Sequence, residues 1–534
     1  MGGFQAERWR GDFFSGEISG LMSEDFPEFN LTTGLDGNGN EKTPILKGYQ
    51  NRWAVAGFFG RMNYDYKGRY LLEMNLRYDG TSRFRRGNRW KLSPSFSLGW
   101  NIAQEKFWQP ISNIANLLKL RFSYGELSNQ NLTSYYPTYR TMNIYAASGN
   151  WLQGGKKTNI ASIGDLVSSS LTWESIRTWN AGVDFGLFDN RLTGSFDYFI
   201  RYTKDMVGKP GELPATLGIG VPVTNNCDLH TKGWELSIGW KDRLVNGFGY
   251  GVNFSLSDQI TIIDKYPDNK TNSISSYLPG YKDGLIWGYE TIGIAKTQEE
   301  MDVHLASLPK GGQDALGSQW SAGDIMYRDL NGDGKISAGA GTLDDHGDMK
   351  ILGDNYSHYF FGLDLTANWK GLDFRAFFQG ALKHDFWPGD NGYFWGAKGS
   401  GSEWNMEAFA PHNDYFRNEP LGLEGSEIGV NLNSYFPRPL FKNGGGAKNQ
   451  YAQSRYVQDA RYIRLKNLQI GYTLPKVWTS KIGLENCRVY VSGENLLTFT
   501  SLFEMYDPET CVGGAGGNAY PLSRTWSFGL SLTF

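Results

Sequence analysis

The chain has 534 residues and a net charge of −3, and it is polar overall, with a mean hydropathy of −0.45, although 15% of its residues are aromatic and 68 are glycine. No stretch approaches the about 20 consecutive apolar residues of a membrane helix, and the balanced charge argues against a nucleic-acid-binding protein, which usually presents a basic face. Three cysteines, Cys227, Cys487 and Cys511, are too few and too scattered for a disulfide framework or a zinc site, although they leave room for one disulfide.

The dominant pattern along the chain is an alternation of apolar and polar residues, which predicts strands with one apolar and one polar face. In YLLEMNLRYD, residues 70–79, the apolar set runs from Tyr70 to Tyr78, while Glu73 and Arg77 belong to the polar set. Such a segment has about the 10 residues of a strand that crosses a bilayer at a tilt. The predicted strands cover, in chain order, residues 3–9, 52–66, 70–79, 91–101, 118–125, 176–187, 191–202, 232–241, 247–257, 358–369, 371–381, 461–474, 486–495 and 523–534.

The connections between these strands fall into two length classes. Short turns are predicted at residues 66–69, 188–191 and 369–372, and long polar segments at residues 80–90, 128–173, 203–231, 258–356, 382–453 and 498–521. Loops beyond about 15 residues are uncommon in compact soluble domains. A soluble propeller or sandwich would need a repeat period, and we find none. We therefore predict an all-β fold, a transmembrane antiparallel up-and-down β-barrel with short periplasmic turns and long extracellular loops.

The last predicted strand, SRTWSFGLSLTF, runs to the final residue of the sequence. Its apolar set consists of Trp526, Phe528, Leu530, Leu532 and Phe534. Every strand of a barrel is paired on both sides, so a closing strand can end the protein and needs an apolar lipid face to its last residue.

Seven stretches resemble the barrel half of the SusC/RagA family of TonB-linked outer-membrane transporters. They are RYLLEMNLRYDGTSRF, WKLSPSFSLGWNIAQEKF, LKLRFSYGELSNQN, GDIMYRDLNGDGKIS, YIRLKNLQIGYTLP, VYVSGENLLTFTS and YPLSRTWSFGLSLTF. The resemblance implies a barrel of about 22 strands with an amino-terminal plug, import driven by TonB, and a SusD-like surface lipoprotein as an extracellular lid. It also implies that the apolar set of the last strand is the signal read by the barrel-assembly machinery.

A member of this family also has a signal peptide, a TonB box, a plug and about eight further strands. The beginning of the sequence, MGGFQAERWR, has no apolar run of signal-peptide type. We therefore interpret residues 1–534 as the carboxy-terminal barrel portion of a transporter, with about 14 strands, and expect that it does not transport alone.

The ionisable residues show no catalytic pattern, so we predict that the protein is not an enzyme. None of the six histidines has a Ser, Cys or carboxylate partner at a recognisable motif spacing, and we interpret them as surface residues of the loops. Charges on the polar face of the strands are ordinary in a wet lumen, and we predict paired structural roles facing the plug. These charges are Glu73, Arg77, Arg121, Asp184, Asp197 and Arg375.

The motif DLNGDGKIS matches the first half of a calcium-binding loop, with oxygen ligands at alternate positions and Gly334 for the tight turn. Ala340 stands where the bidentate glutamate is expected. The candidate Ca²⁺ site comprises Asp329, Asn331, Asp333, Lys335 and Asp344. The alternative is a turn that needs no metal, because Asp, Asn and Gly form turns unaided.

Aromatic residues crowd the long loops, above all between residues 382 and 453. Rings with neighbouring polar groups suit a stacking platform for sugar rings, and the alternative is that they pack the loops together or sit at the membrane interface. The candidate cargo-binding residues are Trp387, Asp390, Asn391, Tyr393, Trp395 and Glu403.

Two functions are consistent with these sequence patterns. The first is TonB-energised import of oligosaccharides or other nutrient oligomers across the outer membrane, with TonB, a SusD-like lipoprotein, outer-membrane lipids and the barrel-assembly machinery as partners. The second is a passive porin or an adhesin-like barrel. Neither requires a cofactor beyond the candidate Ca²⁺, and the residues do not distinguish a glycan from a peptide cargo.

Overall fold

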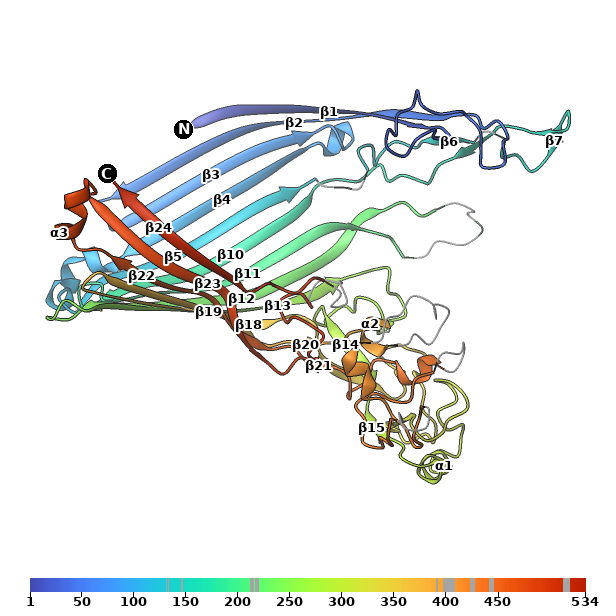
Figure 1. Cartoon of the computed structure of the whole chain (residues 1–534). Helices are drawn as coiled ribbons and strands as arrows, with labels where there is room; N and C mark the ends of the chain where they lie inside the picture. Colours follow the sequence, from blue (N-terminus) through green and yellow to red (C-terminus); the bar gives the residue numbers. More distant parts are fainter. Residues whose placement is uncertain are drawn as a thin grey trace.

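The computed structural model describes residues 1–130, 132, 134–145, 147–211, 216, 220–389, 392–396, 409–422, 428–440, 446–511 and 519–534. Fourteen long strands form one sheet (Figure 1). Each of them pairs with the long strand before it and the long strand after it, and all the pairs are antiparallel. They are β1 (Gly2–Glu17), β2 (Ile45–Tyr66), β3 (Tyr70–Thr81), β4 (Trp90–Asn101), β5 (Ala115–Asn129), β10 (Glu174–Leu187), β11 (Leu192–Gly208), β12 (Thr224–Arg243), β13 (Gly249–Lys265), β18 (His358–Trp369), β19 (Leu372–Lys383), β22 (Tyr462–Thr473), β23 (Asn486–Thr500) and β24 (Thr525–Thr533). This confirms the predicted up-and-down arrangement.

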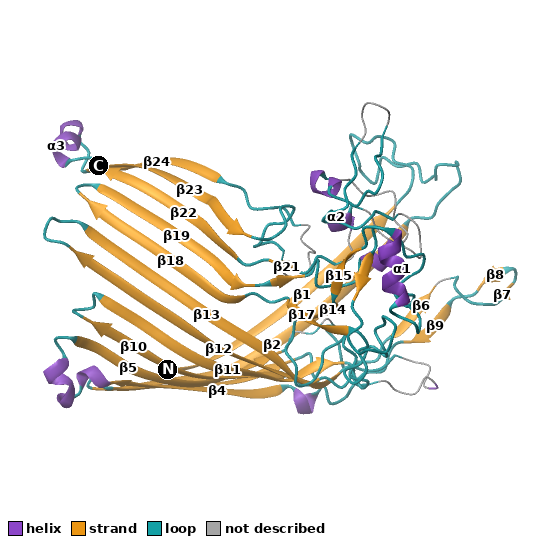
Figure 2. Ribbon diagram, turned by 90° about the horizontal axis from the view of Figure 1, so that it is seen from below, coloured by secondary structure: helices purple, strands orange, loops and turns teal. Residues whose placement is uncertain are grey.

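The sheet curls into a trough, with β1 and β24 as its two edges (Figure 1). Short turns lie at one end of the strands and the long connections at the other, as Figure 2 shows. The β2–β3 turn places Lys67 and Gly68 at φ values of 56° and 67°, which is the left-handed pair of a type I′ hairpin. The β18–β19 turn repeats this with Lys370 at 46° and Gly371 at 90°.

The strands are longer than the sequence pattern predicted. β2 has 22 residues and β12 has 20, whereas about 10 suffice to cross a bilayer. The predicted bounds of the loops at residues 203–231 and 258–356 are therefore wrong, because β11, β12 and β13 extend into these ranges. Pairing continues beyond the membrane because it satisfies backbone hydrogen bonds wherever two strands already run side by side.

Two groups of stacked aromatic rings lie on the outer face, one toward each side of the membrane-facing part of the sheet. Near the short turns, Tyr70 stacks against Trp100 with ring centroids 6.5 Å apart, and toward the long loops Tyr78 stacks against Trp90 at 4.9 Å. Tyr70 and Tyr78 are eight residues apart on β3, which corresponds to about 19 Å along the membrane normal at a tilt of about 45°. The apolar band of an outer-membrane barrel is about 25 Å tall and is flanked by aromatic girdles, so the two ring pairs fit inside this band near its edges.

The remaining elements lie in the connections. The small strands are β6 (Met142–Tyr145), β7 (Leu152–Gln153), β8 (Lys156–Lys157), β9 (Ile160–Ile163), β14 (Leu285–Tyr289), β15 (Thr291–Ile294), β16 (Ile325–Tyr327), β17 (Met349–Asp354), β20 (Asp385–Phe386) and β21 (Gln458–Asp459). The α-helices are α1 (Gln298–Ala306), α2 (Gly392–Trp395) and α3 (Lys476–Thr479), and the 3₁₀ helices are Arg86–Asn88, Ile102–Gln104, Lys106–Ile111, Ala410–Asn413, Gly446–Asn449 and Ser480–Ile482.

Among the described residues, none of the helices combines the length and the apolar character that a membrane crossing requires. All three cysteines are buried and free, so the one disulfide for which the sequence left room is not formed.

Candidate functional site

The polar face of the sheet carries ion pairs between neighbouring strands. Arg121 on β5 contacts Asp184 on β10 and Asp197 on β11, each at 2.8 Å. Residues that face each other across adjacent strands share one face of the sheet, so these charges meet. Other pairs between neighbouring strands are Arg61–Glu73 at 2.8 Å and Arg375–Asp364 at 2.9 Å, and Arg77 pairs with Asp79 of its own strand at 2.9 Å. The predicted pairing of the inward charges is confirmed, and a role against a plug stays a prediction.

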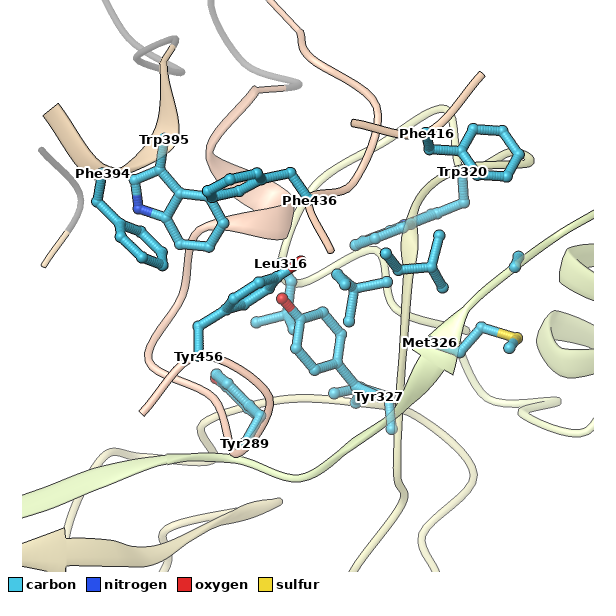
Figure 3. Packing of buried hydrophobic residues seen from close by; sticks show 14 of the residues in the cluster. Tyr289, Leu316, Trp320, Met326, Tyr327, Phe394, Trp395, Phe416, Phe436 and Tyr456 are labelled. Carbon is cyan, nitrogen blue, oxygen red and sulfur yellow. The ribbon is translucent and has the colours of Figure 1, made fainter. Parts of the chain in front are cut away.

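The long connections fold together at the mouth of the trough around a hydrophobic core of their own (Figure 3). Tyr327 is fully buried there and donates its hydroxyl to the backbone oxygen of Lys448 at 2.7 Å. Trp395 packs edge-to-face on Tyr456, with ring centroids 4.8 Å apart. These rings come from segments far apart in the sequence, so the predicted polar loops are in fact packed structures. This core could not be predicted from the sequence, because its rings do not recur at a regular spacing.

A buried ionic cluster ties two of these connections together. The carboxylate of Asp324, which is 0% exposed, contacts Lys448 at 2.7 Å and Arg438 at 3.1 Å, and it accepts a hydrogen bond from Asn449 at 2.9 Å. Burial lowers the pKa of Lys448, and Asp324 opposes that shift. Removing one partner from a buried ion pair costs about 3 to 5 kcal/mol, so this cluster contributes strongly to the arrangement of the mouth. No sequence motif predicts this cluster, because Asp324 and Lys448 lie 124 residues apart in the chain.

Two adjoining cavities open between the loop core and the strands. The larger has a volume of about 940 Å³ and is lined by Tyr277, Trp287 and Trp387 among others, and the smaller has about 820 Å³ and is lined by His358 and Tyr356. Both cavities share Lys282, Asp283, Gly284 and Asn355 in their walls. Concave sites that combine rings with a few polar groups are suited to binding ligands.

The polar wall of the smaller cavity is held in place by hydrogen bonds. His358 lies between Asp258 and Asp354, with ring nitrogen to oxygen distances of 2.7 and 3.0 Å. Tyr356 donates its hydroxyl to Asp283 at 2.9 Å, and burial together with this carboxylate raises the pKa of Tyr356 to about 12. These side chains are therefore pre-oriented polar groups at the cavity wall.

The interpretation of the histidines as surface residues is wrong for three of them. His358, His384 and His412 are 5%, 1% and 8% exposed. The nitrogen Nδ1 of His412 accepts the backbone N–H of Phe409 at 3.0 Å, and burial lowers the pKa of His412. The cause is tertiary packing, since each of these histidines lies where a connection folds back onto the strands or onto the loop core.

The DLNGDGKIS segment forms a tight turn stabilised by its own side chains. The carboxylate of Asp329 accepts the backbone N–H groups of Gly332 and Gly334, at 2.6 and 2.9 Å. Asn331 accepts from the backbone of Asp333 at 2.9 Å, and Asp333 accepts from that of Lys335 at 3.1 Å. In the described part of the chain, no group of three or more His, Cys, Asp or Glu side chains is arranged to hold a metal ion. Calcium binding by this loop, including Asp344, stays a prediction.

The candidate cargo-binding rings are part of the loop core. Tyr393 donates its hydroxyl to the backbone oxygen of Met505 at 2.8 Å, and the indole of Trp395 donates to the oxygen of Gly389 at 2.9 Å. Trp395 is 7% exposed, so the packing interpretation accounts for its contacts, whereas Trp387 borders the larger cavity. Asp390, Asn391 and Glu403 lie outside the described residues. Cargo binding by this group stays a prediction.

The last strand places its apolar set on the outer face. Trp526, Phe528 and Leu530 are 60%, 81% and 61% exposed, and Leu532 and Phe534 are exposed with them. Leu530 lies opposite Val489 on β23, whereas the intervening Ser531 lies opposite Arg488. The parity of this strand is confirmed, and its recognition by the barrel-assembly machinery stays a prediction.

A family model described as TonB dependent receptor-like, beta-barrel matches residues 3–344. The chain therefore belongs to this family, whose members lie in the outer membrane and cross it with strands. It is 30% identical over 502 residues to TonB-dependent receptor P3 of Formosa agariphila, covering 91% of this chain and 46% of that protein. It is 27% identical to TonB-dependent receptor SusC of Bacteroides thetaiotaomicron, covering 91% of this chain and 44% of that protein.

Among solved structures, that of the RagAB peptide transporter matches 100% of this chain and 53% of its own chain, with a TM-score of 0.73 and 21% identity. The sequence and fold comparisons together confirm the predicted SusC/RagA type. The chain spans about half the length of the curated relatives it matches.

Proposed function

We propose that this chain is the carboxy-terminal barrel portion of a transporter that imports nutrient oligomers across the outer membrane with energy supplied through TonB. The observation that carries the proposal is the relation to TonB-dependent receptor P3 and SusC over 91% of the chain. The plug and TonB box of the whole transporter would then lie outside these 534 residues. The inward ion pairs support a role in holding a rigid lumen wall.

The mouth supplies the features that an importer needs for selecting cargo. The two cavities present rings beside oriented polar groups, which suits an oligosaccharide or a peptide. The packed connections around them offer a firm platform on which a SusD-like lipoprotein could close from the extracellular side. One structural neighbour, RagAB, is a peptide transporter, so a peptide is as good a candidate cargo as a glycan.

The test uses the full-length transporter in its native membrane. Deleting its gene should abolish uptake of the cargo, and a version with a disabled TonB box should restore the protein but not the uptake. Uptake that persists without TonB would instead favour a passive porin. Deleting the neighbouring lipoprotein gene, with barrel abundance monitored, tests the proposed lid separately.

A further inference from the structure

The outer face of β1 and β2 carries arginines directly above the membrane-facing rings. On β2, every second residue from Tyr66 toward the extracellular end faces outward. These residues are apolar or small as far as Ala54, and the next outward residue is Arg52. Arg52 lies 14 residues from Tyr66, which is about 33 Å along the membrane normal at the usual tilt, just beyond the about 30 Å hydrocarbon core. Arg52 therefore lies at the level of the extracellular lipid headgroups.

A two-part groove is hollowed into this face. Its upper compartment, of about 500 Å³, is lined by Arg8, Arg52, Arg89 and two tyrosines, Tyr136 and Tyr139. Its lower compartment, of about 420 Å³, has a floor of Ala6, Ala54, Ala56 and Gly80 and is bordered by Trp90. Arg8, Ala54 and Arg89 line both compartments, so the groove is continuous from the aromatic girdle to the arginines.

The arginines of the groove have few partners of their own. Within the part of the chain that the structure describes, the side chain of Arg8 makes no hydrogen bond or ion pair, and Arg8 lies on β1, an edge strand that is paired on one side with β2. Arg89 uses only Nε, which donates to the oxygen of Phe84 at 2.9 Å, and Arg52 donates to the neutral side chain of Gln50. Arg52 also interacts electrostatically with the carboxylate of Asp12, so within the described residues Arg8 and Arg89 are the groove arginines without a carboxylate partner.

Two acidic residues lie nearby, and Asp12 offsets part of the positive charge of Arg52. Asp12, on the same outer face, is engaged with Arg10 at 2.9 Å. Glu7 borders the lower compartment, but strand alternation places its side chain on the lumen side, opposite Val55. The groove therefore combines an excess of positive charge with an apolar lower half.

We propose that this groove binds the phosphate-bearing headgroup of an outer-leaflet glycolipid of the lipopolysaccharide class. The planar guanidinium groups of Arg8, Arg52 and Arg89 match phosphate oxygens in a bidentate way. The small residues of the lower compartment leave room for a sugar ring or the start of an acyl chain beside Trp90, and basic pockets at this level of a membrane protein recognise anionic headgroups. The inference concerns anchoring and does not depend on the cargo or on transport.

The experiment measures binding of purified lipopolysaccharide to the full-length transporter in detergent. The triple variant Arg8→Gln, Arg52→Gln, Arg89→Gln should lose affinity by about tenfold or more and copurify with less lipid phosphate. The matched control is Arg201→Gln, which removes an exposed arginine from the lumen face and should leave binding unchanged. Heat-modifiable migration on gels verifies that each variant has assembled.

A second variant tests the groove without removing any charge. Ala54→Phe fills the floor between the two compartments and should weaken lipopolysaccharide binding while leaving the arginines in place. Phosphatidylglycerol and inorganic phosphate serve as competing probes. Unchanged lipopolysaccharide affinity in both assembled variants overturns the proposal, and so does binding of inorganic phosphate alone. Preference for lipopolysaccharide over both competitors, lost in both variants, supports it.

Discussion

A charge placed on the lipid face of β24 tests the orientation of the barrel wall most directly. Leu530 is 61% exposed on the outer face and lies four residues before the last residue of the chain, which is about 9 Å above the end of the strand at the usual tilt. The midplane of an apolar band of about 25 Å lies at about 12 Å. Leu530→Arg in the full-length transporter should therefore cost about 2 to 4 kcal/mol, the range for a charge near the midplane.

The matched control is Ser527→Arg on the opposite face. Ser527 lies opposite the uncharged Ser492 on β23. Ser531 faces the same side but is a less suitable control, because it lies opposite Arg488 and a new arginine there would add repulsion between like charges. The measurement is the free energy of unfolding from lipid vesicles in denaturant, together with the yield of heat-modifiable protein in membranes. Equal destabilisation by both variants would refute the assignment of faces, since only one of the two positions faces lipid.

The remaining predictions concern the open sheet, the turn, the cavity and the buried histidine. The chain expressed alone with a signal sequence should not give a heat-modifiable barrel, because β1 and β24 present unpaired edges; a stable species with a cold-versus-boiled gel shift would contradict this. If calcium holds the DLNGDGKIS turn, Asp329→Ala with Asp333→Ala should abolish bound Ca²⁺ and expose residues 324–345 to protease, whereas no metal signal from the unmodified protein at millimolar Ca²⁺ favours the plain turn. Trp387→Ala with Tyr393→Ala should weaken cargo binding in calorimetry by about tenfold without lowering barrel assembly, and unchanged affinity would assign both rings to packing. Because burial lowers the pKa of His412, the unfolded chain binds the proton first, so the loop core should lose stability as the pH falls below about 6.5; limited proteolysis should show a smaller pH dependence for His412→Gln.

Local sequence patterns were sufficient to predict the strands and turns that form the wall of the barrel. The alternation around Leu530 predicts both the strand and its outward face, because strand side chains alternate with a period of two whatever the strand is paired with. The Lys67–Gly68 turn is equally local, since a two-residue hairpin depends only on which residues tolerate positive φ. The lengths of the strands were underestimated, because alternation weakens above the membrane while backbone pairing continues.

The packing of the long connections at the mouth could not be predicted from local patterns. The candidate rings around Trp395 were noticed for their composition, but composition does not say whether a ring faces a cargo or the interior of a folded loop. The partners of Arg464 illustrate the same limit, since it contacts Asp507 and Glu509 at 2.9 and 2.8 Å across more than 40 residues of chain. Such pairs form where the connections fold back onto the strands, and the spacing of residues in the sequence does not predict where that happens.

By itself, the sequence determined the all-β class, the order and faces of the strands, the position of the tight turns and the family, because these depend on periodicity and on motifs within single segments. Only the tertiary structure decided that the long connections form a packed core closed by Asp324 and Lys448, that His358 is buried between two carboxylates, and that Arg8, Arg52 and Arg89 meet in one groove. The physical reason is that burial and charge pairing arise between segments far apart in the chain, whose meeting depends on the curvature of the sheet and the folding of the loops above it.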